Sequence, residues 1–109
     1  MVLIFGGVYQ GKLDYAKSRF SGTRKIIDSA DKWLLSLIQE EKDITTEVKR
    51  FMDNNTDAVV IINDISCGVV PIDPVMRQWR EEVGRFMAQA AEKSDEVVRL
   101  FCGIPMKIK

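Results

Sequence analysis

A short apolar run that leads directly into a glycine-rich stretch constrains this chain more than any other feature. Val2-Leu3-Ile4-Phe5 is followed by Gly6-Gly7-Val8-Tyr9-Gln10-Gly11-Lys12. An apolar run closed by glycines is typical of a buried parallel strand. The Gly-x-x-x-x-Gly-Lys spacing after such a strand is typical of a loop whose backbone amides surround phosphate groups. The sequence therefore predicts a strand, a phosphate loop and a helix in succession.

Five residues of this loop are candidate nucleotide-binding residues: Gly6, Gly7, Gly11, Lys12 and Leu13. Lys12 is also a candidate catalytic residue. Gly6, Gly7 and Gly11 would allow the backbone to wrap around phosphate, and the Lys12 ammonium would neutralise it. The complete motif has Ser or Thr after the lysine, whereas this chain has Leu13, which offers no oxygen to magnesium. The simpler alternative is a tight turn with a surface lysine and with Leu13 facing the core. The sequence thus predicts phosphate binding with weakened use of Mg²⁺.

Beyond the loop, strand-like and helix-like segments alternate. This order predicts a three-layer α/β fold of the P-loop NTPase type, with a mostly parallel sheet and an antiparallel C-terminal edge strand. We expect strands at 2–5, 26–27, 58–62 and 97–102, an edge strand at 106–109, helices at 12–20 and 74–93, and a helical region at 30–54 that breaks or restarts around 43–47.

Three polar residues follow expected strands, where open α/β sheets bind ligands. Asp28 comes after the second strand and is a candidate magnesium ligand and catalytic residue, although Asp28 or Ser29 would equally serve as a helix cap. Asn63 and Asp64 end the most apolar strand. Asp64 is a candidate base and Asn63 a candidate substrate contact, with an Asx turn at the start of the loop as the alternative.

Two arginines one helical turn apart are candidate anion-binding residues. Arg77 and Arg80 lie on one face of the 74–93 helix and could both reach an anion. The commoner role of such residues is a solvated face of ion pairs with neighbouring carboxylates. Trp79, Phe86 and Met87 on the same helix indicate core or interface packing.

Composition excludes several classes of function. The 109 residues are expected to form a single domain, and sixteen basic residues balance sixteen acidic ones, which argues against nucleic-acid binding. The sequence contains no histidine, so imidazole cannot act as base, ligand or nucleophile. Because we find no membrane-spanning segment and no signal peptide, we expect a cytoplasmic protein with Cys67 and Cys102 as free thiols.

The C-terminal half resembles the bifunctional adenosylcobinamide kinase/adenosylcobinamide-phosphate guanylyltransferases of cobalamin biosynthesis. Residues 63–71, Asn-Asp-Ile-Ser-Cys-Gly-Val-Val-Pro, are similar to the family's Asn-Glu-Val-Gly-x-Gly-Ile-Val-Pro. Residues 77–85 resemble its Arg-x-Phe-Arg-Asp-x-x-Gly-Arg helix, and residues 95–97 and 103–109 resemble its closing Ala-Asp-Glu-Val and Gly-Ile-Pro-x-Lys-x-Lys strands. Nearer the N-terminus, the loop and residues 26–34 resemble its Gly-Gly-x-x-Ser-Gly-Lys-Ser and Leu-Leu-Asp-Cys-Leu-Thr-x-Trp-Leu.

The resemblance implies ATP or GTP and a corrinoid, cobinamide, as ligands, and a homo-oligomer of three or six subunits. The departures from the family pattern imply lost chemistry. A block that carries the guanylylated histidine is missing between Phe20 and Lys25, Gln10 replaces a serine, and Leu13 replaces the motif's final serine. We therefore expect a nucleotide-binding relative without guanylyltransferase activity and with weak or absent kinase activity. The alternative is a structural oligomer that binds no nucleotide.

Overall fold

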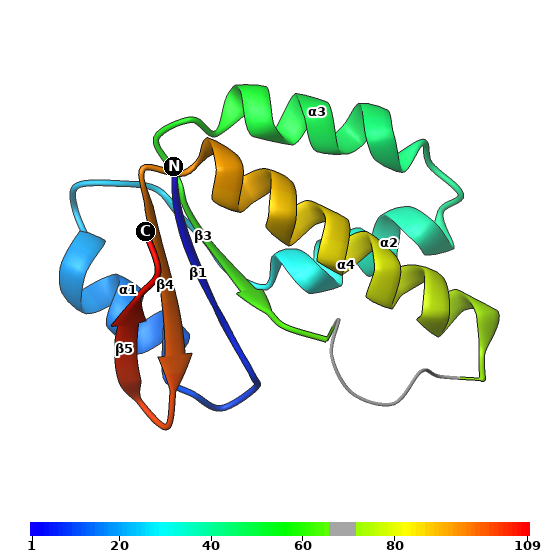
Figure 1. The fold of residues 1–109 in the computed structure, drawn as a ribbon. Helices are drawn as coiled ribbons and strands as arrows, with labels where there is room; N and C mark the ends of the chain where they lie inside the picture. Colours follow the sequence, from blue (N-terminus) through cyan, green and yellow to red (C-terminus); the bar gives the residue numbers. More distant parts are fainter. Residues whose placement is uncertain (66–71) are drawn as a thin grey trace.

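The computed structural model describes residues 1–65 and 72–109, and in them a central sheet lies between helices (Figure 1). Of the expected loop at 63–74, residues 66–71 lie outside the described part, and Cys67 is among them. The elements are β1 (Val2–Gly6), α1 (Lys12–Phe20), β2 (Ile26–Ile27), α2 (Ala30–Gln39), α3 (Ile44–Asn54), β3 (Val59–Asn63), α4 (Pro74–Lys93), β4 (Glu96–Phe101) and β5 (Ile104–Lys107).

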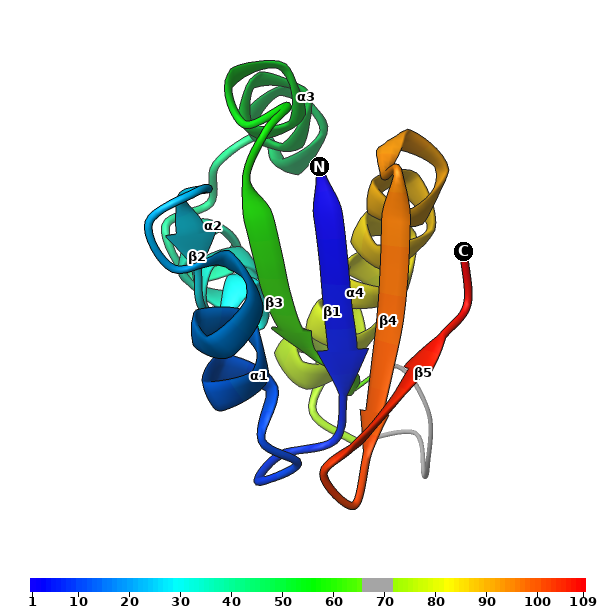
Figure 2. The ribbon, with the colours of Figure 1, turned by 90° about the vertical axis from the view of Figure 1, so that its left-hand side faces the viewer.

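The strands form one mixed sheet in the order β2-β3-β1-β4-β5 (Figure 2). β1 pairs in parallel with β3 and β4, and β2 pairs in parallel with β3, whereas β5 runs antiparallel to β4. The prediction of a mostly parallel sheet with an antiparallel C-terminal edge strand is therefore confirmed. The register places Gly6 opposite Asn63, so the ends of β1 and β3 are level at the edge where the glycine-rich loop begins.

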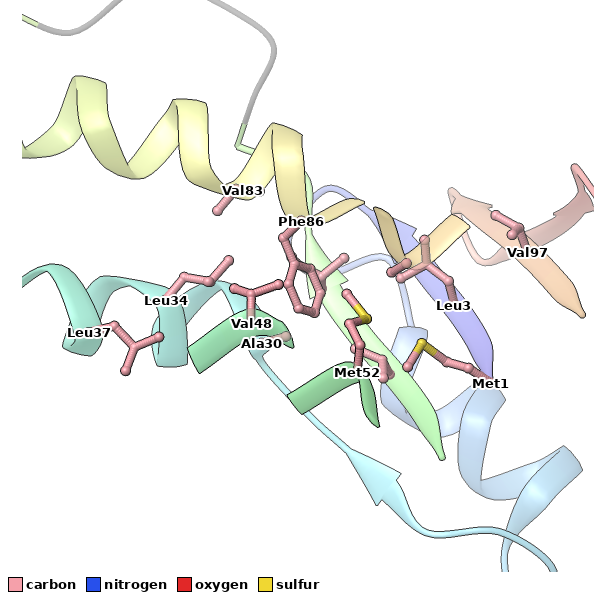
Figure 3. Close-up of a cluster of buried hydrophobic side chains, with 13 residues drawn as sticks. Met1, Leu3, Ala30, Leu34, Leu37, Val48, Met52, Val83, Phe86 and Val97 are labelled. Atoms are coloured by element: carbon pink, nitrogen blue, oxygen red, sulfur yellow. The ribbon is translucent and has the colours of Figure 1, made fainter. Parts of the chain in front are cut away.

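Alternate side chains of the central strands enter two separate cores, as expected for strands covered on both faces. Leu3 faces α2, α3 and α4, where Phe86 and its neighbours fill the larger core (Figure 3). Ile4 faces α1, the one described helix that covers the opposite face, which inserts Ala16 and Phe20 there. Trp79 and Met87 also pack against the larger core, so the core reading of the α4 stripe is confirmed.

The helical region at 30–54 divides into two helices at the predicted break. α2 ends at Gln39, and Asp43 caps α3 by accepting a hydrogen bond from the Thr46 amide at 3.4 Å. α4 begins in the same way, because the Asp73 carboxylate accepts from the amides of Val75 and Met76. Among the described helices, none combines the length and apolarity that crossing a bilayer would require.

The C-terminal strand starts earlier than predicted. β5 begins at Ile104, which pairs with Phe101, so Cys102 and Gly103 alone form the turn. Both residues have positive φ, 52° and 74°, as a two-residue hairpin of the I′ type requires. The sequence-based prediction excludes Pro105 from the strand, but an edge strand tolerates a residue that lacks an amide hydrogen.

Candidate functional site

The glycine-rich loop connects β1 to α1, and two of its glycines are required by geometry. Gly6 has φ of 153°, and a Cβ built on it would lie 2.4 Å from the Leu100 carbonyl oxygen of β4. Gly11 occupies the N-cap position of α1 with φ of 83°, a conformation that side-chain-bearing residues rarely adopt. The first amides of α1 follow directly and, as at any helix start, lack carbonyl partners within the helix. These amides suit an anion.

Lys12 is the first residue of α1 and is largely withdrawn from solvent, with 7% of its surface exposed. Its ammonium donates a hydrogen bond to the Gly7 carbonyl oxygen, inside the loop. Burial lowers the pKa of Lys12, and the negative charges of Asp31 and Asp28 oppose that shift. The Lys12 ammonium is thus hydrogen-bonded to a neutral carbonyl in the same loop. A phosphate oxygen could replace this carbonyl without breaking an ion pair.

A cleft of about 680 Å³ opens beside this loop, at the carboxyl ends of β1, β2 and β3. It brings together five residues that the sequence singled out. These are Gly11, Lys12, Leu13, Asp28 and Asn63. Residues from both expected strand ends therefore meet the loop, as the parallel register requires.

Leu13 lies in the first turn of α1, half-buried, and packs against the smaller core while also lining the cleft. Both sequence readings of this residue therefore hold at once: the side chain fills core space and offers no oxygen to the site. Asp28 is exposed on the cleft wall, and Ser29 takes the N-cap position of α2 with φ of 58° and without a side-chain capping bond.

The other predicted residues, Gly6, Gly7, Asp64, Arg77 and Arg80, are not among the described residues that line the cleft. Asp64 follows β3, and its amide donates to the Gly6 carbonyl oxygen at 2.9 Å, which ties the loop to the neighbouring strand. Arg77 and Arg80 lie in the first half of α4, the former exposed and the latter half-buried. Further along α4, Arg85 forms ion pairs with Glu81 and Glu82.

A buried carboxylate, Asp31, escapes sequence-based prediction. It is 2% exposed and accepts hydrogen bonds from both the amide and the side-chain nitrogen of Asn63, at 3.1 and 3.3 Å. Its carbonyl accepts from Trp79 Nε1 at 2.7 Å, so α4 anchors the start of α2. One sequence feature could have indicated this burial. Asp31 lies three residues before Leu34 and seven before Ile38, and this spacing places all three on the buried face of α2.

The positive and negative side chains that line the cleft are equal in number, which is a second feature that the sequence does not reveal. Lys32 and Asp14 line the wall together with Lys12 and Asp28, which gives two cations and two anions. Within the described residues, no three side chains of the Cys, Asp or Glu type converge in a manner suited to a metal ion. The cleft therefore offers amides and ammonium groups to an anion and only isolated carboxylates to a cation.

The fold and the site define a mixed α/β protein with a glycine-rich strand-to-helix loop beside a cleft. A family model described as cobinamide kinase / cobinamide phosphate guanyltransferase matches residues 17–108, most of the chain. The chain belongs to this family. The match begins inside α1, so it does not include the glycine-rich loop. A search of curated proteins gave no match.

Proposed function

We propose that this protein is a P-loop nucleotide-binding member of its family that has lost guanylyltransferase activity and keeps weak kinase activity or none. In this proposal residues 1–109 form a single P-loop NTPase-like domain that binds ATP or GTP. The observation that carries it is the meeting of Gly11 and Lys12, at the start of α1, with the cleft at the carboxyl ends of three strands.

Phosphate would bind where the loop amides and Lys12 converge. The ammonium exchanges the Gly7 carbonyl for a phosphate oxygen, a stronger partner because it is charged. Burial supports this exchange, since attraction between charges is stronger where water is excluded. Lys32, on the cleft wall, adds a second positive charge toward the anion.

Guanylyl transfer through a phosphohistidine-like intermediate has no nucleophile here, because the sequence contains no histidine. The connection between α1 and β2, where the family's histidine block would fall, consists of residues 21–25 only. We therefore assign no guanylyltransferase activity to this chain.

Magnesium use would be weak for a reason of ligand chemistry. Mg²⁺ at nucleotide sites is commonly held by one or two protein oxygens together with substrate phosphates. Asp28 supplies such an oxygen on the cleft wall, but Leu13 supplies none. The metal, when bound, would neutralise charge on the phosphates. Asp28 would hold it directly or through water, and phosphoryl transfer to a cobinamide hydroxyl would be slow.

An exposed apolar surface favours a second candidate function, that of a structural oligomer without nucleotide. Phe101, Ile104, Met106 and Ile108 on the β4–β5 hairpin and the tail that follows it are each at least 40% exposed. Large exposed apolar side chains gathered on one element often mark an interaction site. We propose a homo-oligomer in either case, a trimer or hexamer as in the family, within cobalamin biosynthesis in the cytoplasm.

Thermal-shift titration with ATP and GTP, with magnesium or with EDTA, distinguishes these functions. A ligand at ten times its Kd stabilises by about 1.4 kcal/mol, which raises Tm by about 6–11 °C for a domain of this size. We expect this rise in EDTA as well as in magnesium. A rise that requires magnesium would support a working kinase, and no rise with either nucleotide would overturn the binding proposal and favour the structural oligomer.

A further inference from the structure

The phosphate loop contacts the β4–β5 hairpin through Gln10, a residue that also lines the cleft. Gln10 lies in the loop, one residue before the N-cap of α1, and its carboxamide oxygen accepts a hydrogen bond from the Cys102 amide. These residues are 92 positions apart in the chain. The contact therefore joins two elements that the sequence does not connect.

Both ends of the Gln10 carboxamide are engaged. Its nitrogen donates to the Val8 carbonyl oxygen at 3.3 Å, within the loop, while its oxygen faces the hairpin. A carboxamide has distinct donor and acceptor ends, so the two contacts together select one orientation of the side chain. Gln10 thus bridges the loop and the hairpin turn.

The Cys102 amide reaches Gln10 because of the turn in which it lies. Cys102 and Gly103 both have positive φ, and Phe101 pairs with Ile104 immediately before and after them. This conformation strains a non-glycine residue, and a hydrogen bond from its amide offsets part of that strain. The start of the loop also lies close to β4 at Gly6, because glycine has no Cβ to collide with the Leu100 carbonyl.

We propose that Gln10 is a positioning residue that clamps the phosphate loop to the β4–β5 turn and so links occupation of the loop to the hairpin. The clamp holds the loop between Gly6 and Gly11 in one shape. A loop held in its binding shape loses less conformational freedom when phosphate binds. The effect on affinity rests on the proposed nucleotide function, whereas the clamp itself does not.

The consequence is reciprocal. If the clamp favours the binding shape, phosphate in the loop must favour the clamp to the same degree. Bound triphosphate should therefore slow hydrogen exchange at the Cys102 amide, although this amide lies in the hairpin. A purely structural contact would stabilise the protein without responding to the ligand.

The test compares wild type with Gln10→Met, which keeps the length of the side chain but removes both polar ends. The first measurement is amide hydrogen exchange by NMR without ligand. We expect the Cys102 amide to exchange about three- to tenfold faster in Gln10→Met, the range for one ordinary hydrogen bond. The Ile108 amide, which donates to the Val97 carbonyl beside the same hairpin, serves as the internal control and should not change.

The second measurement is the affinity for inorganic triphosphate in EDTA, by calorimetry. We expect Gln10→Met to bind triphosphate about three- to tenfold more weakly. The Tm of the free protein should change by no more than it does for an ordinary surface substitution. We expect triphosphate to slow Cys102 exchange in wild type and not in Gln10→Met. Gln10→Glu keeps an acceptor for Cys102 and should retain slow exchange without ligand.

The outcomes separate the two proposals. Unchanged Cys102 exchange in ligand-free Gln10→Met would overturn the clamp, whatever the protein binds. Faster exchange combined with equal triphosphate affinity in both proteins would overturn the positioning role. Absence of triphosphate binding in wild type, with the exchange effect intact, would overturn the proposed function and the positioning role but leave the contact between loop and turn established.

Discussion

Replacing Gly6 with alanine tests the close approach between the glycine-rich loop and β4. The added Cβ would lie 2.4 Å from the Leu100 carbonyl oxygen, at a residue with φ of 153°. Backbone strain of this kind costs about 1–3 kcal/mol. Relieving the overlap requires β1 and β4 to separate locally, and overpacking of that kind costs about 1–3 kcal/mol more.

Gly22→Ala is the matched control. Gly22 also has positive φ, 83°, but within the described part of the chain no atom would lie within 4 Å of an added Cβ, so alanine there meets backbone strain alone. We expect Gly6→Ala to exceed Gly22→Ala in lost stability by about 2 kcal/mol, equivalent to a Tm lower by roughly 8–16 °C.

The assay is urea denaturation followed by tryptophan fluorescence, with the midpoint and the slope measured for both variants. Equal slopes would show that both variants unfold from comparably compact states. Equal midpoints for Gly6→Ala and Gly22→Ala would refute the argument that β4 closes against the start of the loop.

Three further predictions concern the site and the ion pairs. Asp31→Ala leaves two donors of Asn63 without their acceptor, so we expect the free energy of unfolding, measured by urea denaturation, to fall by about 2–4 kcal/mol. The exposed control Asp14→Ala should lose about 0.5 kcal/mol or less, and equal losses would contradict the buried role of Asp31. Leu13→Ser returns a hydroxyl to the loop, so the ATP-induced rise in Tm should become larger in magnesium than in EDTA, and an unchanged ratio would count against the ligand argument. The Arg19 guanidinium holds the pKa of Glu96 below its ordinary value of 4.5, so this pair stabilises the fold above that pH and loses its effect as the pH falls. Glu96→Gln should therefore make the free energy of unfolding less sensitive to acid. Parallel pH profiles for wild type and Glu96→Gln would disprove the assignment.

Local sequence patterns are sufficient for most of the fold. The strand before Gly6, the helix after Gly11 and the cap at Asp43 depend on neighbouring residues, and each lies close to its predicted place. The predicted start of β5 is wrong because it rests on the intrinsic preference of Pro105, whereas the edge position removes the need for an amide hydrogen.

The site can be predicted only where strand ends bring residues together. Lys12, Asp28 and Asn63 meet in the cleft because parallel strands align their carboxyl ends. The bond between Gln10 and Cys102 joins residues 92 positions apart, and no local pattern indicates it. The burial of Asp31 likewise depends on the packing of α4 against α2, which the sequence of α2 alone does not specify.

The most direct test of phosphate binding by the loop is calorimetric titration of ATP in EDTA into wild type, Lys12→Met and Lys17→Met. Lys17 lies on the same helix but is exposed, so its replacement removes one positive charge without touching the cleft lining. We predict metal-independent binding to wild type and Lys17→Met, and none to Lys12→Met. Equal binding by all three proteins, or no binding to wild type, would contradict the account.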